Sequence, residues 1–242
     1  QDDNLCFAHE DIQFDTIGWG EKIISKLSET DCGVIGFAGT TARISALCGI
    51  GLSRAHWRSN YIQHMNKGGM KSCFKNPDRV EFSPVVSVDG MCLFVSRKVW
   101  QKVRFDEKTF PNFHLYDLDF TTAVFRAGYI NYICNTVIVE HFSEGYYTQE
   151  WLAATIDFNN KWRDALPLYV SGFPCIKNLD RYVRSREFRF IKAMMKSRGK
   201  CSWELIDGLC RQYYRKYPFY RSIVVWFHAY RYRKRWKREG RL

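Results

Sequence analysis

The chain has 242 residues, of which 46% are apolar and 17% aromatic, and its formal net charge is +12 at pH 7. This length suits one domain with a substantial core plus an appendage, and the composition excludes an intrinsically disordered chain. No stretch approaches the ~18 apolar residues that a membrane-spanning helix needs, so we expect no such helix.

The positive charge is concentrated at the C-terminal end. Residues 181–242 hold 19 Lys and Arg against 4 Asp and Glu, whereas residues 1–180 hold 18 against 21. A slightly acidic body therefore precedes a tail with a net charge of +15. Such a tail suits a nucleic acid or an anionic membrane surface as its partner.

The nine cysteines are scattered, and no CxxC pair occurs among them. This spacing predicts mostly reduced thiols in a cytosolic protein and argues against a zinc ribbon. The first residues lack the basic region and apolar run of a signal peptide, which agrees with a cytosolic location.

Strand and helix patterns alternate from the start of the chain. Residues 5–8 predict a short buried strand that ends at the HED triplet, residues 9–11. Apolar residues at i, i+4 and i+8 predict a helix over 19–27, and "VIGFAG" at 34–39 predicts another buried strand. Residues 40–84 are polar and predict loops or a hairpin.

The next elements surround a loop that is rich in acids and aromatics. "VVSVDGMCLFVS" predicts strand-like runs on either side of Asp89-Gly90, and Ser96 is expected to cap a short helix. After the loop, a helix is expected to begin near Leu118 and to end at Gly128, a favourable residue beyond a helix C-terminus.

Two further strands and a capped helix complete the pattern. "YINYIC" and "VIVEH" predict strands, and Thr148 is expected to cap a helix that carries Trp151, Phe158 and Trp162 on one side. Alternating strands and helices predict an α/β fold, with helices packed on a sheet.

Three polar clusters fall at the ends of predicted strands or in the loops that follow them, where open α/β sheets bind ligands. They are His9-Glu10-Asp11, the pair Asp117 and Asp119, and His141. Asp, Glu and His together suit Mn²⁺ or Mg²⁺, and imidazole favours Mn²⁺. If the strand continues through the triplet, the side chains of His9 and Asp11 point the same way and both reach one ion.

The acidic pair is predicted at a helix start, where the helix dipole favours an ionised carboxylate. An ionised Asp117 beside an acceptor hydroxyl is able to serve as a general base. Each residue also has a structural interpretation. Asp117 is suited to be an N-cap, His141 a hydrogen-bonded histidine, and the triplet a polar exit from a strand.

Five segments in chain order resemble family-two-like glycosyltransferases of the GT-A fold, in particular the glycosyltransferase-like proteins of bacterial surface-polysaccharide loci. The resemblance covers roughly residues 5–165, and its specific part is the block from Asp89 to Gly145. The segments are "FAHEDIQF", "GVIGFAG", "VDGMCLFVSRKVW", "RFDEKTFPNFHLYDLDFTTAVFRAGY" and "VIVEHFSEGYY".

The resemblance implies transfer of a sugar from a nucleotide-sugar donor to an acceptor hydroxyl. It assigns His9-Glu10-Asp11 to the DxD-type motif that holds a divalent ion on the donor diphosphate, with His9 where Asp is more usual. It implies that His141 contacts the metal or the diphosphate.

The same resemblance assigns Asp117 as the catalytic base of an inverting displacement and Asp119 as a neighbour that positions the acceptor or the loop. The acceptor side is assigned to Asp89, Gly90, His114 and Tyr116. In such folds an earlier βαβα region binds most of the donor nucleoside. Because no such region precedes the triplet, the segment is expected to begin partway into a GT-A domain.

The resemblance and the charge pattern together predict two domains. Residues 1–170 are expected to form the GT-A-like domain, a mixed sheet flanked by helices, and residues 171–242 a basic, aromatic-rich helical extension. Tyr220, Val224 and Phe227 recur at i, i+4 and i+7, which indicates an amphipathic helix for an anionic membrane surface, although packing on the domain remains an alternative.

The function that we expect is glycosyl transfer to a glycan or lipid-linked acceptor, in the cytoplasm and peripherally on the inner face of the cell membrane. The alternatives are a catalytically inactive remnant or binding module of the same fold and a nucleic-acid-binding protein. Nucleic acid is the less favoured partner, because no RNP-like or zinc motif accompanies the basic tail. A metal-dependent hydrolase is disfavoured by the block from Asp89 to Gly145.

Overall fold

The structure, a computed structural model, describes residues 4–50, 55–145, 147–173, 175–196, 201–218 and 221–242. The chain forms two compact units. The sheet unit comprises residues 1–44, 49–145 and 164–174, and the helical unit comprises residues 45–48, 146–163 and 175–242. The domain boundary expected at residue 170 stays a prediction.

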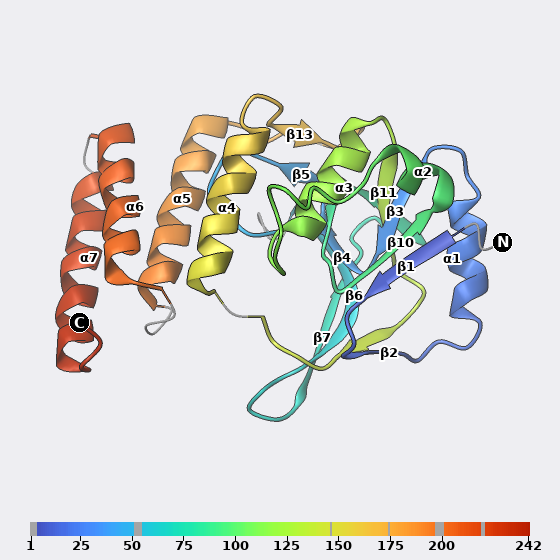
Figure 1. Ribbon diagram of the computed structural model, residues 1–242, viewed down its shortest axis with the longest axis horizontal. Helices are drawn as coiled ribbons and strands as arrows, with labels where there is room; N and C mark the ends of the chain where they lie inside the picture. Colours follow the sequence, from blue (N-terminus) through green and yellow to red (C-terminus); the bar gives the residue numbers. More distant parts are fainter. Residues whose placement is uncertain (1–3, 51–54, 146, 174, 197–200, 219–220) are drawn as a thin grey trace. The chain divides into compact units, whose positions relative to one another are not determined.

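Two mixed sheets and a two-stranded ribbon make up the strands of the sheet unit (Figure 1). The five-stranded sheet has the order β1 (Asn4–Ala8), β10 (Cys92–Ser96), β3 (Cys32–Gly36), β11 (Ile130–Cys134) and β8 (Phe82–Val85). The second sheet has the order β2 (Ile12–Phe14), β12 (Val139–His141), β6 (Trp57–His64), β4 (Ala38–Thr40) and β9 (Ser87–Val88), and β7 (Met70–Lys75) pairs with β6. The ribbon joins β5 (Ala42–Arg43) to β13 (Leu168–Tyr169).

Three helices of the sheet unit are α1 (Trp19–Leu27), α2 (Arg97–Lys102) and α3 (Tyr116–Arg126). The central strands are buried on both faces because helices pack on each side. Ile35 and Phe94 join a core with α1, whereas the neighbouring residues along the strands, Val34 and Val95, join a core with α3. This is an α/β fold with mixed sheets, as the sequence predicts.

The helical unit contains α4 (Gln149–Trp162), α5 (Leu179–Lys196), α6 (Trp203–Lys216) and α7 (Arg221–Arg238). Thr148 caps α4 and Ser202 caps α6, each by accepting a hydrogen bond from a backbone amide in the first turn. The core of the unit includes Met194, Ile206 and Val225 from the last three helices. Among the described residues, no helix is both long enough and apolar enough to cross a membrane.

Several local predictions are confirmed. Helix α1 buries Ile23 and Leu27, and the Ser96 side chain accepts a hydrogen bond from the Val99 amide at the start of α2. The polar region 40–84 contains the β6–β7 hairpin, whose turn uses two glycines at positive φ, Gly68 and Gly69.

Two local predictions are wrong. Strand β1 is not fully buried, because it is an edge strand and only one side of it packs on the core. Helix α3 begins at Tyr116, with Leu115 as its N-cap, so Asp117 is not an N-cap. The amphipathic pattern expected at Tyr220, Val224 and Phe227 stays a prediction: α7 forms over Arg221–Arg238, Val224 is half-buried, Phe227 is exposed, and Tyr220 lies outside the described residues.

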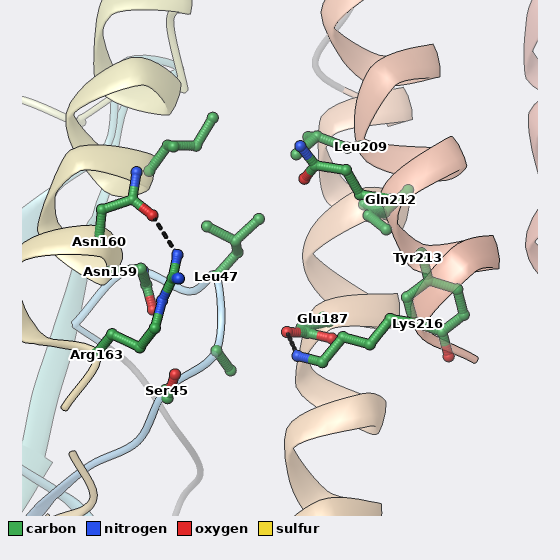
Figure 2. A pocket seen from close by; sticks show the side chains of 13 residues that line it. Ser45, Leu47, Asn159, Asn160, Arg163, Glu187, Leu209, Gln212, Tyr213 and Lys216 are labelled. Carbon is green, nitrogen blue, oxygen red and sulfur yellow. Dashed lines mark hydrogen bonds and ion pairs between the residues drawn. The ribbon is translucent and has the colours of Figure 1, made fainter.

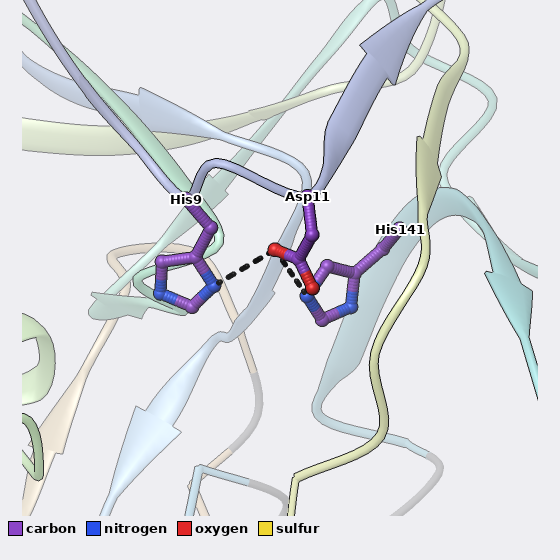
Figure 3. Close-up of side chains that lie close together, drawn as sticks. All are labelled: His9, Asp11 and His141. Carbon is purple, nitrogen blue, oxygen red and sulfur yellow. Dashed lines mark ion pairs between the residues drawn. The ribbon is translucent and has the colours of Figure 1, made fainter. Parts of the chain in front are cut away.

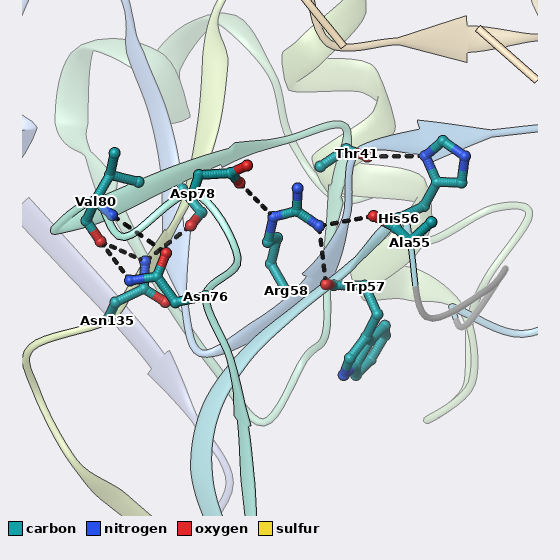
Figure 4. Close-up of polar contacts among 10 residues, drawn as sticks. Thr41, Ala55, His56, Trp57, Arg58, Asn76, Asp78, Val80 and Asn135 are labelled. Carbon is teal, nitrogen blue, oxygen red and sulfur yellow. Dashed lines mark hydrogen bonds and ion pairs between the residues drawn. The ribbon is translucent and has the colours of Figure 1, made fainter. Parts of the chain in front are cut away.

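A buried arginine fixes the start of β6 (Figure 4). The Arg58 side chain is 2% exposed; its Nε donates to Asp78, and its Nη1 donates to the carbonyls of Ala55 and Trp57. A guanidinium taken out of water needs such partners, since an uncompensated buried charge costs several kcal/mol. The contacts tie the loop around Asp78 to the strand that later carries part of the candidate site.

A buried amide ties α3 to the five-stranded sheet. Asn131 in β11 is fully buried; its Nδ2 donates to the carbonyls of Val86 and Thr121, and its Oδ1 accepts from the Val34 amide. Three elements that are distant in sequence are therefore held by one side chain.

We expect Asn131→Ala to destabilise the protein by ~2–5 kcal/mol, because three buried backbone groups lose their partner. Urea unfolding followed by circular dichroism measures this change. Asn112→Ala, at an exposed position, is the matched control and should stay within ~0.5 kcal/mol of the wild type. Equal, small effects of the two substitutions would contradict the role given to Asn131.

Candidate active site

Two residues that follow β1 meet a residue of β12 that is distant in sequence (Figure 3). His9 and Asp11 lie in the turn between β1 and β2, and His141 is the last residue of β12. Asp11 Oδ1 lies 3.9 Å from His9 Nδ1 and 3.7 Å from His141 Nε2. One ligand atom from each residue lies within 4.8 Å of the other two, which is a spacing that can hold a metal ion.

The reason for this convergence differs from the one expected from the sequence. The strand does not continue through the triplet, since β1 ends at Ala8 and a turn follows. The turn and the pairing of β12 with β2, in which His141 stands opposite Ile12, bring the side chains together. Glu10 lies at the turn and is not part of the triad.

The hydrogen bonding of His141 suits a metal ligand. Its Nδ1 lies 3.2 Å from Gln63 Oε1, and because an amide oxygen only accepts, that nitrogen carries the proton. Within the described part of the chain, the buried Nε2 atom has no hydrogen-bond partner, and its lone pair faces Asp11. A second partner that orients an imidazole in this way is typical of metal-binding histidines.

The electrostatics of the triad favour the protonation states that bind a cation. Burial lowers the pKa of His141 and outweighs the opposing effect of Asp11 and Asp89, so the imidazole tends to be neutral. Burial acts to raise the pKa of Asp11, but its hydrogen bond with Ser143 and the charges of His141 and His9 bring this pKa below its usual value. A neutral imidazole and an ionised carboxylate suit Mn²⁺ or Mg²⁺.

A half-buried carboxylate lies near this triad. Asp117, in the first turn of α3, accepts a hydrogen bond of 2.7 Å from the Gly90 amide. Burial, and then the charge of Asp89, raise the pKa of Asp117 to about 7. A carboxyl group with a pKa near neutrality is suited to exchange a proton during a reaction.

Short contacts link the start of α3, which carries Asp117, to the triad. The hydroxyl of Tyr116 lies 3.5 Å from His9 Nε2, and the His9 amide donates to the Met91 carbonyl. The Asp89-Gly90 turn therefore stands beside both groups. Gly90 is required there, since a Cβ atom would lie 2.8 Å from Asp117 Cβ and 2.9 Å from the Tyr116 hydroxyl.

The remaining predicted site residues are Asp89, Asp119 and His114. Asp89 accepts from the Met91 amide, and burial raises its pKa. Asp119 is 2% exposed and lies two positions after Asp117, a spacing that does not place two side chains on one side of a helix. His114 precedes α3, and its ring lies 5.6 Å from that of Phe113.

Sequence reasoning missed two residues of the site. Phe113 is 65% exposed, and its ring lies 5.3 Å from that of His9, so it offers an aromatic surface beside the triad. Gln63 orients His141 because β6 pairs in parallel with β12. The aromatic loop gives a signal for Phe113, whereas no local pattern indicates the partner of His141.

The helical unit contains a separate cavity of about 450 Å³ (Figure 2). No predicted site residue lines it. Its charged side chains contact neighbours within the cavity: Arg163 donates to Asn160, and Lys216 donates to Glu187. The residues that line it include no group of His, Cys, Asp and Glu that could hold a metal ion, so the turn at residues 9–11 is the better candidate for catalysis.

Side chains that could hold a metal ion, near a carboxylate of near-neutral pKa, are a chemistry suited to group transfer. The family model described as "Glycosyltransferase like family" matches residues 4–163. The chain belongs to this family, which confirms the resemblance to family-two-like glycosyltransferases, and the mixed α/β fold is consistent with a GT-A-like fold. A search of the curated proteins finds no match.

We expect Asp117→Asn to change the pH dependence of stability. The folded wild type holds a proton on Asp117 up to about pH 7, while the unfolded chain releases it near pH ~4. Wild-type stability therefore falls as pH rises through this interval, by ~1.4 kcal/mol for each pH unit between the folded and unfolded pKa values. Asn keeps an acceptor for the Gly90 amide and does not titrate, so the variant should gain stability relative to the wild type.

Urea unfolding with a chelator present, at several pH values across the interval, measures the difference. Asp157→Asn, at an exposed position of α4, is the control and should show no such trend. A stability difference between Asp117→Asn and the wild type that is constant with pH would mean that Asp117 has an ordinary pKa.

Proposed function

We propose that the chain transfers a sugar from a nucleotide-sugar donor to an acceptor hydroxyl, with inversion at the anomeric carbon. The observation that carries this proposal is the position of Asp117, with a pKa raised to about 7, beside the His9–Asp11–His141 triad in a chain of a glycosyltransferase family. Mn²⁺ or Mg²⁺ is the cofactor that we propose, held by His9, Asp11 and His141, with Glu10 in the turn on the donor side.

The proposed reaction is a direct displacement. The acceptor oxygen forms a bond with the anomeric carbon, its proton passes to a carboxylate oxygen of Asp117, and the bond from that carbon to the donor diphosphate breaks. The diphosphate leaves with the bonding electron pair. The divalent ion, when bound, would neutralise charge on the departing diphosphate.

Neighbouring residues have supporting roles in this proposal. Gly90 holds the Asp117 carboxylate in place through its amide. The charge of Asp89 raises the pKa of Asp117, which makes it a stronger base. Tyr116, His114 and the exposed ring of Phe113 are proposed to line the acceptor side. Asp119 is proposed to position α3 and its loop rather than to touch the substrate.

We further propose that the acceptor is a glycan or a lipid-linked sugar of surface polysaccharide synthesis, and that the chain works in the cytoplasm at the inner face of the cell membrane. The net charge of +15 over residues 181–242 supports this placement, because anionic lipids attract basic segments.

Binding of the donor should depend on the metal. In calorimetric titration with UDP, GDP and their sugars, we expect binding only when Mn²⁺ is present. His141→Ala and Asp11→Ala should each weaken binding of Mn²⁺ alone about 10–100-fold or more, since each removes a ligand. His228→Ala, a histidine of α7, is the matched control and should bind as the wild type does.

Binding of Mn²⁺ that neither substitution weakens would reject the proposed metal site. A folded wild type that binds Mn²⁺ but none of these nucleotides would instead indicate a binding module or remnant that keeps the fold without the transferase activity.

Asp117→Asn should lower kcat by ~10²–10⁴-fold, the usual contribution of a general base, and leave the donor Kd unchanged. Wild-type kcat should rise as the pH increases through about 7, because the base must be ionised. Steady-state rates with a responding donor and acceptor measure both effects, and Asp157→Asn is the control. A variant that retains full kcat would remove Asp117 from the mechanism.

A further inference from the structure

Helix α7 has two faces of different character. Val225, Ala229, Tyr232 and Trp236, at i, i+4, i+7 and i+11, belong to the core of the helical unit or pack against it. Ile223, Trp226, Phe227 and Tyr230, at i, i+3, i+4 and i+7, are exposed by 63%, 57%, 50% and 47%. Since residues at these spacings share one side of a helix, the exposed residues form a continuous apolar face opposite the packed one.

The packed face fixes the orientation of the helix within its unit. Val225 is fully buried, and Trp236 is 3% exposed. The indole nitrogen of Trp236 donates to the Met195 carbonyl of α5, and its ring lies 5.2 Å from that of Trp203 in α6. The exposed face therefore cannot turn inward without breaking these contacts.

The charges of α7 are separated along its length. The helix has no Asp or Glu, and six of its seven Lys and Arg residues follow Tyr230. Lys234, Lys237 and Arg238 continue the spacing of the apolar face and are exposed. The outer side thus has an apolar, aromatic first half and a strongly basic second half.

The aromatic rings of this face are partly covered by other side chains of the helix. Trp226 stacks on Tyr230 with ring centres 5.7 Å apart, Lys234 lies 4.8 Å from the centre of the Tyr230 ring, and Arg231 lies 5.6 Å from that of Phe227. Stacking of nucleic acid bases needs open ring faces. Trp and Tyr rings bind at a bilayer interface even when other side chains cover part of them, and cations beside them contact the headgroups.

We infer that the outer face of α7 is a docking surface for an anionic lipid bilayer, with Ile223, Trp226, Phe227 and Tyr230 inserted at the headgroup boundary. An amphipathic helix of this composition lies in the plane of the interface. The cations of its second half contact lipid phosphates, which attract basic side chains near the surface. This face would make the membrane contact of the proposed function, and the inference holds whether or not the chain transfers a sugar.

Vesicle co-sedimentation of the full chain tests the inference, without metal or nucleotide. We expect binding to phosphatidylcholine vesicles that contain phosphatidylglycerol, weaker binding at high salt, and little binding to phosphatidylcholine alone. Trp226→Ser with Phe227→Ser should weaken binding to the anionic vesicles at least about tenfold, since both substitutions remove apolar surface that the bilayer would bury. Lys234→Glu with Lys237→Glu should also weaken it.

The matched control is Met70→Ser with Phe74→Ser, which removes two apolar side chains of similar exposure, 66% and 60%, from strand β7. It should bind vesicles as the wild type does, and thermal unfolding should show that all variants are folded.

Three outcomes would overturn the inference. They are wild-type binding that both pairs of α7 substitutions leave unchanged, failure of the folded wild type to bind anionic vesicles, and a wild-type dimer in ultracentrifugation that Trp226→Ser with Phe227→Ser dissociates.

Discussion

The amide of Asn131 is the constraint on which the candidate active site depends. It is fully buried in β11 and hydrogen bonds to β3, to the segment before β9 and to α3. Gly33 leaves the room for it, because a Cβ atom there would lie 2.6 Å from Asn131 Oδ1. Helix α3 is thus held at one height over the sheet, and Asp117 in its first turn is held with it.

The close approach of α3 to the Asp89-Gly90 turn then sets the chemistry. The Thr121 hydroxyl contacts the backbone of Val88 and the Asp117 carboxylate accepts from Gly90, so the helix meets the turn at two points. Two half-buried acids, Asp89 and Asp117, are brought together. Burial raises the pKa of both carboxyl groups, and the charge of Asp89 raises that of Asp117 further.

The triad depends on a different set of strands. His141 ends β12, which pairs with β2 on one side and with β6 on the other. Asp117 therefore comes with α3 on the five-stranded sheet, and His141 comes with the second sheet. His9 connects the two, because its Nε2 lies 3.5 Å from the Tyr116 hydroxyl and its ring lies 5.8 Å from that of His141. A change in the packing between the sheets would therefore alter the distance from Asp117 to the triad.

The sequence by itself determined several of the helices and strands, the α/β class, the caps at Ser96 and Thr148, the family and the basic tail, because propensity, capping and charge are local properties. It also indicated the HED triplet, Asp117 and His141 as polar groups at strand ends. Only the tertiary structure decided that β1 is an edge strand, that Gln63 orients His141, that Asp89 raises the pKa of Asp117, and which face of α7 is exposed. Each of these depends on strand pairing or helix packing between residues far apart in the chain, which no local pattern encodes.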